Sequence, residues 1–258
     1  MKLATWNVNS LKVRLPQVLE LLAEHKPDAL CLQELKLEDA NFPRAEIKAA
    51  GYDAVFSGQK TYNGVAILTP GALADVSMGI PGYDDPQKRL IAATVDGVRV
   101  ICVYVPNGEA VESEKYKYKL DWLMKLIVWL KQEMANYPKL ALLGDYNIAP
   151  EDRDVHDPKA WQGKVLFSEP EKAAFKDMLA LGLADSFRLF DQAEKSFSWW
   201  DYRMNGFKRN LGLRIDHILL SAELAKSCKS CAIDKAFRVK ERPSDHAPVI
   251  AEIGISEN

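Results

Sequence analysis

The segment 140–150 places an acid and an amide two positions apart at the end of an apolar run. A continuous apolar run bounded by turn-forming residues is typical of a buried strand, and Gly144 and Pro150 favour a bend and then a stop. Asp145 and Asn147 would therefore lie where a core strand opens into a loop, with side chains on one side if the backbone stays extended. A carboxylate and a carboxamide in this position could build a reaction site. The alternative is an ordinary turn, because Asp and Asn are common turn residues.

Other polar side chains also stand at the ends of apolar runs. Taken singly, most of them have a structural explanation as turn residues, solvated strand ends or edge aromatics. A carboxylate at 216 is harder to explain, because the apolar residues beside it predict burial, and a buried carboxylate needs a partner. The residues concerned are Asn7, Glu34, Tyr104, Asp216, Asp245 and His246.

Together these side chains supply what cation-assisted chemistry on a phosphate requires. Glu34 and Asp245 can provide the oxygen ligands that hard cations prefer, and Asp145 can act as a base or position water. His246 can donate to phosphoryl oxygens if a carboxylate such as Asp216 orients it. Their occurrence together therefore favours a site for metal-assisted hydrolysis over a separate structural role for each residue.

Hydrophobic periodicity predicts the elements that position these residues. Strands are expected at 2–8, 29–32, 51–56, 63–68, 91–95, 98–105, 140–143, 197–202, 213–220 and 247–255, and helices up to about 25, at 112–135 and at 170–181. Asp96-Gly97 predicts a two-residue hairpin, and Gly182 a left-handed helix cap. Each half runs strand, helix and then a buried strand ending in an acid, Glu34 or Asp145. That pattern suits two packed sheets with helices outside.

The composition is that of an ordinary globular protein, with 258 residues, 48% hydrophobic, 27% charged and a net charge of −2. No global positive charge indicates a nucleic-acid partner, although a local basic face or a bound cation could serve. No low-complexity linker divides the chain, so one domain, 1–258, is expected.

Four cysteines occur, at 31, 102, 228 and 231. The last two have zinc or redox spacing, but no second pair completes a zinc site. The N-terminal residues contain no signal-peptide core, and no apolar run is long enough for a membrane span. We therefore expect a reduced, cytoplasmic protein.

Six short motifs occur in an order that resembles the exonuclease III family of abasic-site endonucleases. They are Trp6-Asn-Val-Asn9, Gln33-Glu34, Tyr104-Val-Pro-Asn107, Gly144-Asp-Tyr-Asn147, Leu213-Arg-Ile-Asp216 and Ser244-Asp-His-Ala-Pro248. The resemblance extends from residue 3 to about 253. It implies an α+β four-layer sandwich like that of pancreatic deoxyribonuclease, with two mixed sheets face to face, helices on both outer faces and the site at one edge. The wider group is the endonuclease/exonuclease/phosphatase superfamily.

The resemblance also implies an activity and a role for each residue. The activity is that of a base excision repair nuclease, cutting duplex DNA 5′ to abasic sites and processing 3′ ends as an exonuclease, phosphatase or phosphodiesterase. Mg²⁺, or Mn²⁺ in its place, would assist the hydrolysis. The metal ligands would be Glu34, Asn7 and Asp245, with Asp145 and Asn147 also near; the catalytic residues would be Tyr104, Asp145, Asn147, Asp216 and His246.

Substrate selection is expected between residues 197 and 215. By resemblance, Trp199, Leu213 and Ile215 would form an apolar pocket for a base-free sugar, which costs little unstacking to extrude. Four cations in this segment, Arg203, Lys208, Arg209 and Arg214, would contact phosphates; the alternative is a solvated loop. The expected partner is double-stranded DNA with abasic sites or 3′ ends, bound by a monomer.

Two positions depart from the family pattern. Leu35 stands where a small polar residue is expected after Glu34, and the loop 107–114 carries three glutamates where some relatives place a basic residue. The acidic loop leaves open how tightly the protein grips DNA and how abasic cleavage compares with 3′-end processing. Two other functions also remain open: a phosphodiesterase or phosphatase acting on a non-DNA substrate, and a catalytically silent nucleic-acid-binding regulator.

Overall fold

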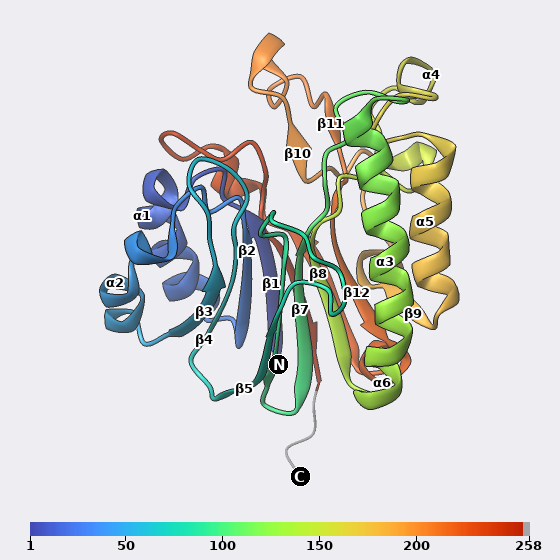
Figure 1. Ribbon diagram of the computed structural model, residues 1–258. Helices are drawn as coiled ribbons and strands as arrows, with labels where there is room; N and C mark the ends of the chain where they lie inside the picture. The colour runs from blue at the N-terminus through green and yellow to red at the C-terminus, as the bar shows by residue number, and fades with distance from the viewer. Residues whose placement is uncertain (255–258) are drawn as a thin grey trace.

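Two six-stranded mixed sheets pack face to face in a computed structural model that describes residues 1–254 (Figure 1). The first sheet has the order β13 (Cys228–Ile233), β14 (Val249–Ile253), β1 (Lys2–Asn7), β2 (Ala29–Gln33), β4 (Val65–Thr69) and β3 (Asp53–Ser57). The second has the order β5 (Leu73–Met78), β6 (Leu90–Val95), β7 (Val98–Tyr104), β8 (Leu140–Asp145), β12 (Asp216–Ser221) and β9 (Leu183–Asp185). A two-stranded ribbon joins β10 (Trp199–Trp200) to β11 (Gly212–Leu213).

Helices cover both outer faces, which gives the four layers that the sequence predicts. In Figure 1, α1 (Leu11–His25) and α2 (Arg44–Ala49) lie outside the first sheet, and α3 (Glu114–Asn136) and α5 (Glu169–Ala180) outside the second. Two shorter helices are α4 (Pro158–Trp161) and α6 (Ala222–Ala225), and single 3₁₀ turns occur at Asp39–Asn41, Asp152–Asp154, Ser186–Leu189, Arg203–Asn205 and Lys235–Arg238. Among residues 1–254, no helix combines the length and apolar character that crossing a bilayer needs.

The two halves repeat the same unit, a parallel strand pair joined by a long helix. β1 and β2 pair in parallel through α1, and β7 and β8 pair in parallel through α3. Both pairs are covered on both faces, which explains their continuous apolar runs. The carboxyl ends of each pair lie together, so the residues after the four strands gather at one edge of the sandwich.

Alternation along the strands assigns side chains to the layers. On β7, Val100 and Cys102 face the core between the sheets, whereas Ile101 and Val103 pack against the helices outside. Successive strand residues point to opposite faces, so Tyr104 continues the inner row. The polar strand ends therefore open from the inter-sheet layer.

Several local predictions are confirmed. The hairpin turn has positive φ at both Asp96 and Gly97, as a type I′ turn requires. Gly182 follows α5 with φ +107°, which is the predicted left-handed cap. Leu35, one of the two positions that depart from the family pattern, is fully buried in the core beneath α1 and α2. Its Cβ lies so close to Gly64 that a side chain at position 64 would not fit.

Other local predictions differ from the structure. The predicted strand 197–202 is reduced to β10, and 213–220 is interrupted between β11 and β12. The final strand ends at Ile253; residue 255 lies outside the described residues. The segment 228–231, considered for metal spacing, forms part of β13, and both cysteines are free thiols.

Candidate active site

Asp145 stands at the centre of the site, at the end of β8. Gly144 is required before it, because a Cβ there would lie 1.9 Å from the carbonyl oxygen of Val103. The Oδ1 atom of Asp145 accepts the backbone N–H of Asn147 at 2.9 Å, and Oδ2 accepts Nδ2 of Asn7 at 2.9 Å. Both carboxylate oxygens are therefore oriented by the chain before any ligand is present.

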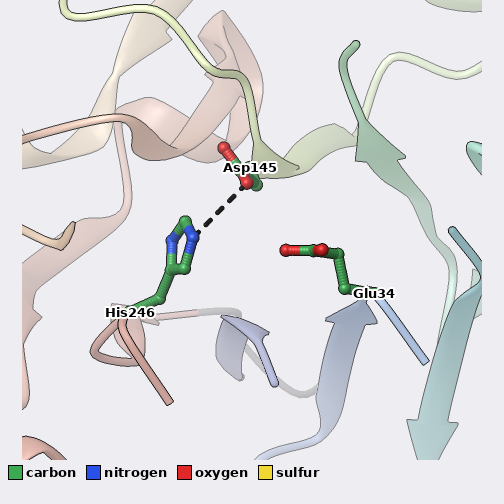
Figure 2. Close-up of side chains that lie close together, drawn as sticks. All are labelled: Glu34, Asp145 and His246. Carbon is green, nitrogen blue, oxygen red and sulfur yellow. Dashed lines mark ion pairs between the residues drawn. The ribbon is translucent and has the colours of Figure 1, made fainter. Parts of the chain in front are cut away.

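Glu34 and His246 converge on Asp145 from other segments (Figure 2). Nε2 of His246 lies 3.7 Å from Oδ2 of Asp145. One ligand atom of each of the three residues lies within 4.8 Å of the others, and this is the only such His, Cys, Asp or Glu group among residues 1–254. Three segments that are far apart in sequence thus build one charged cluster.

His246 is held by the carboxylate that the sequence predicted. Its Nδ1 lies 2.8 Å from Oδ2 of Asp216, and its carbonyl oxygen accepts Nε1 of Trp6 at 3.0 Å. Burial would lower the pKa of His246, but Asp216 and then Asp145 raise it to about 10. The imidazole is therefore cationic at neutral pH and presents Nε2–H towards the cluster.

Burial raises the pKa of the Asp145 carboxylate, whereas it would lower that of His246. The pKa of Asp145 is raised to about 7; the charge of His246 opposes this rise, and that of Asp216 adds to it. Of this buried pair, we place the proton on His246, because that assignment leaves opposite charges 3.7 Å apart. A carboxylate with so high a pKa is suited to accepting a proton near neutral pH.

Glu34 follows β2 in a left-handed conformation with φ +53°, which turns its side chain into the site. Its Oε2 accepts Nδ2 of Asn7 at 2.6 Å, and Lys36 lies 3.6 Å from Oε1. Asn7 thus meets Glu34 and Asp145 through its NH₂ group, while its Oδ1 accepts the N–H of Asn9. In this arrangement the NH₂ group of Asn7 bonds to both carboxylates, and its role as a metal ligand stays a prediction.

The donor set fits a hard divalent cation. Two carboxylates, Glu34 and Asp145, approach each other in a partly buried pocket, and Glu34 contributes to the raised pKa of Asp145. A cation between them would relieve that repulsion, and carboxylate oxygens are the ligands that Mg²⁺ prefers. Asp245 lines the same pocket but lies outside the cluster, with Oδ1 bonded to Asn9 and Oδ2 to Trp199.

Tyr104 adds a neutral donor on the β7 side. Burial and the neighbouring Glu34 raise its pKa well above the usual value, so its hydroxyl keeps the proton. The guanidinium of Arg89 lies 4.7 Å from the centre of the tyrosine ring and donates to the Tyr104 carbonyl oxygen. The ring is therefore clamped, and its hydroxyl is directed towards Glu34 in the pocket.

A pocket of about 210 Å³ opens above the cluster. It is lined by Glu34, Tyr104, Asn107, Asp145, Asn147, Leu166, Trp199, Ile215, Asp245 and His246. Trp199 and Ile215 thus form part of its wall, as expected. Leu213 does not line it: this residue pairs with Trp199 across the β10–β11 ribbon and is fully buried behind the wall.

Leu166 takes a place in the pocket wall that sequence reasoning missed. It lies in an irregular loop with no periodic or motif signal, and its φ of +76° is rare for a leucine. Asn107 was likewise missed as a lining residue, although it lies within a quoted motif. A wider cleft of about 800 Å³, lined in part by Arg89 and Lys115, also includes Tyr104 and Asn107.

The positively charged cluster is only partly as expected. Arg203, Lys208 and Arg209 are exposed on the loop after β10, with Arg203 paired to Asp201 at 2.7 Å. Arg214 is not available to phosphates, because it is buried and forms 2.7 Å ion pairs with Asp154 and Asp185. Its role is to hold the interrupted segment between β11 and β12.

The acidic loop is partly neutralised by its own neighbours. Glu109 pairs with Lys115 at 3.1 Å, and Glu114 with Lys117 at 2.7 Å. Ser113 caps α3 by accepting the N–H of Tyr116. Two of the three glutamates of the loop are therefore engaged, which reduces the repulsion that the sequence suggested.

Comparison with known proteins gives consistent matches along nearly the whole chain. Residues 4–246 match the model of the Endonuclease/Exonuclease/phosphatase family. The exodeoxyribonuclease III of Haemophilus influenzae is 38% identical, over 98% of this chain and 99% of that protein. A 3′ phosphatase from Neisseria, solved with a product DNA hairpin, is 52% identical with a TM-score of 0.97, covering 99% of this chain and 100% of the other. An AP endonuclease from Archaeoglobus fulgidus is 41% identical with a TM-score of 0.95 and the same coverage.

Proposed function

Since the match spans 4–246, the chain belongs to the endonuclease/exonuclease/phosphatase family, and on this premise we propose that it is a divalent-cation-dependent DNA repair nuclease. Its reaction is phosphodiester hydrolysis 5′ to abasic sites, together with removal of nucleotides and phosphates from 3′ ends of duplex DNA. The relatives named for those reactions support the substrate class. The observation that carries the chemistry is the convergence of Glu34, Asp145 and His246 at one pocket.

In this proposal Asp145 orients and deprotonates the attacking water. Its oxygens are held by Asn147 and Asn7, and its raised pKa suits proton acceptance at neutral pH. A water hydrogen-bonded to this carboxylate would lose a proton to it as the oxygen attacks phosphorus. Mg²⁺ or Mn²⁺, held by Glu34 and Asp145 with Asp245 across the pocket, would offset negative charge on the phosphoryl group.

In this proposal His246 and Tyr104 donate hydrogen bonds to the phosphoryl oxygens. The imidazolium, kept charged by Asp216, donates from Nε2, and the phenol of Tyr104 donates its O–H. Donors fixed by the fold before the reaction stabilise developing charge without reorganisation. Trp199 and Ile215 would then contact the sugar at the abasic or 3′-terminal position.

The exposed cations of the loop after β10 would contact DNA phosphates. Arg203, Lys208 and Arg209 project from the ribbon that also supplies Trp199 to the pocket. Phosphate contacts position a protein on DNA without reading its sequence. We also propose that the chain acts as one domain and as a monomer. We also propose a cytoplasmic location, in keeping with its four free thiols.

The test is a panel of duplexes assayed side by side. It contains an internal abasic analogue, a 3′-phosphate at a nick and a recessed 3′ end, each with Mg²⁺, Mn²⁺ or EDTA. We expect turnover with either cation, none with EDTA, and a loss of about 10²- to 10⁴-fold in Asp145→Asn. Asp53→Asn, which changes an exposed ion pair, is the matched control and should retain activity. A wild-type protein inert on all three duplexes with both cations would refute the proposal.

A further inference from the structure

Lys119 is a fully buried lysine that the proposed chemistry does not use. It projects from α3, and its Nζ donates to the carbonyl oxygens of Asn147 at 2.7 Å and Asn107 at 3.1 Å. Its third contact is Oε1 of Glu171 at 2.5 Å. An ammonium has three N–H donors, so all of them are engaged, and two reach main-chain atoms of pocket-lining residues.

Glu171, from α5, is equally buried and equally occupied. Its Oε1 accepts the N–H of Leu166 at 3.0 Å as well as Lys119. Its Oε2 accepts both the N–H and the hydroxyl of Ser168, at 3.0 and 2.6 Å. The ion pair thus joins three separate loops, those of Asn107, Asn147 and Leu166.

The loops joined by this pair contain two residues in the left-handed region. Asn147 and Leu166 have φ of +49° and +76°, a conformation that asparagine adopts readily and that is strained for leucine. Lys119 holds the carbonyl of Asn147, and Glu171 holds the amide of Leu166. Asn147 in turn donates its N–H to Asp145. The pair therefore acts at the two positions where the pocket backbone would otherwise relax.

We propose that Lys119 and Glu171 are positioning residues, which hold Asn147 and Leu166 and through them the Asp145 carboxylate and the pocket wall. The inference rests on the proposed nuclease function. In this proposal the buried ion pair maintains the geometry of the site as well as the stability of the fold. Positioning errors near 1 Å can cost roughly 100-fold in rate, so the pair should affect turnover more than substrate binding.

The test separates positioning from stability with paired substitutions. Lys119→Met alone strands a buried carboxylate and should lower Tm by roughly 10 °C. Adding Glu171→Gln removes that charge and should restore at least half of the loss. In the double variant we nevertheless expect kcat to stay roughly 10- to 100-fold below wild type with KM changed less than about 2-fold.

Arg99 and Glu133 provide a matched control. Arg99, on β7, and Glu133, on the same helix α3 as Lys119, form a part-buried 2.8 Å ion pair at the ends of those elements away from the site. Arg99→Met with Glu133→Gln should change Tm and leave kcat within about 2-fold of wild type. Equal losses of kcat in the two double variants would overturn the inference, as would a Lys119/Glu171 double variant with wild-type kcat.

Glu171→Asp covers the case in which the methionine variants do not fold. It keeps both charges and withdraws the carboxylate by one methylene, so the fold should survive while kcat falls roughly 3- to 10-fold. Unchanged kcat in this variant would refute the inference.

Wild type is assayed first: an inert wild type contradicts the proposed function. Faster amide exchange across 145–168 in the variants than in the control tests the positioning separately, and equal exchange would overturn it.

Discussion

Replacing Asp216 with asparagine should move the alkaline limit of activity to lower pH. Oδ2 of Asp216 lies 2.8 Å from Nδ1 of His246, and both side chains are buried. Burial would lower the pKa of His246, so the rise to about 10 comes from its carboxylate neighbours, with Asp216 the larger contributor. Asparagine keeps the shape of that neighbour and removes its charge.

The size of the effect follows from the contact distance. An opposite charge within about 4–6 Å changes a pKa by about 1–3 pH units, and each unit corresponds to about 1.4 kcal/mol. The variant should therefore lose about 1–4 kcal/mol of preference for the imidazolium. At pH 9 wild type still presents the charged donor, whereas the variant would have lost much of it.

The same change has a signed effect on stability. The pKa of His246 is about 10 in the folded protein, above its ordinary value of 6.5. Its contribution is fully present below pH 6.5 and is lost as pH rises through about 10. In Asp216→Asn that contribution should be smaller and its loss complete at a lower pH, because the folded-state pKa is lower.

The assay is kcat/KM from pH 6 to 10.5 on the duplex with a 3′-phosphate, with His246 followed by NMR titration. Asp234→Asn is the matched control, because Asp234 forms a 2.8 Å contact with His25 outside the site. We expect the alkaline limb to move only in Asp216→Asn. An unmoved limb, or an equal movement in Asp234→Asn, would show that the charge of Asp216 does not govern His246.

Two further predictions concern the pocket wall and its support. Leu166→Gly should widen the pocket, raising abasic cleavage relative to 3′-phosphate removal, and should lower Tm because a buried apolar side chain is lost. An unchanged ratio on the same panel would show that Leu166 does not restrict entry. Burial and then Arg214 lower the pKa of His217 to about 4 from 6.5, so stability should be full above pH 6.5 and fall by about 3 kcal/mol as pH drops to 4. Urea unfolding across this range measures the slope, which should flatten in His217→Gln; an equal slope would contradict the assignment.

The polar strand ends were accessible to sequence reasoning because their positions are encoded locally. An apolar run ending in Gly144-Asp145 predicts a core strand that stops at a loop, and two-residue alternation places Asp145 on the same face as Leu143. The repeated strand–helix–strand unit predicts that Glu34 and Asp145 end equivalent strands. Fold and cluster thus followed from periodicity, turn residues and motif order.

The segments around the pocket wall were harder to predict because their backbone is held by distant partners. Ser198 explains the interruption between β11 and β12: its hydroxyl accepts the N–H groups of both Ile215 and Asp216 at 3.0 Å. These two amides bond to a side chain from another segment in place of a neighbouring strand. No local pattern at 213–216 indicates that arrangement.

By itself, the sequence determined most of the core strands and the acids at their ends, because each depends on residues near in sequence; β5, β9 and β13 were not predicted. Only the tertiary structure decided which charges face solvent and which are buried. Arg214 looks like a phosphate contact until Asp154 and Asp185 are brought beside it, and Lys119 looks like an ordinary helix lysine until Glu171 meets it. Burial and pairing are properties of elements packed together from distant parts of the chain, so neither can be seen in a local pattern.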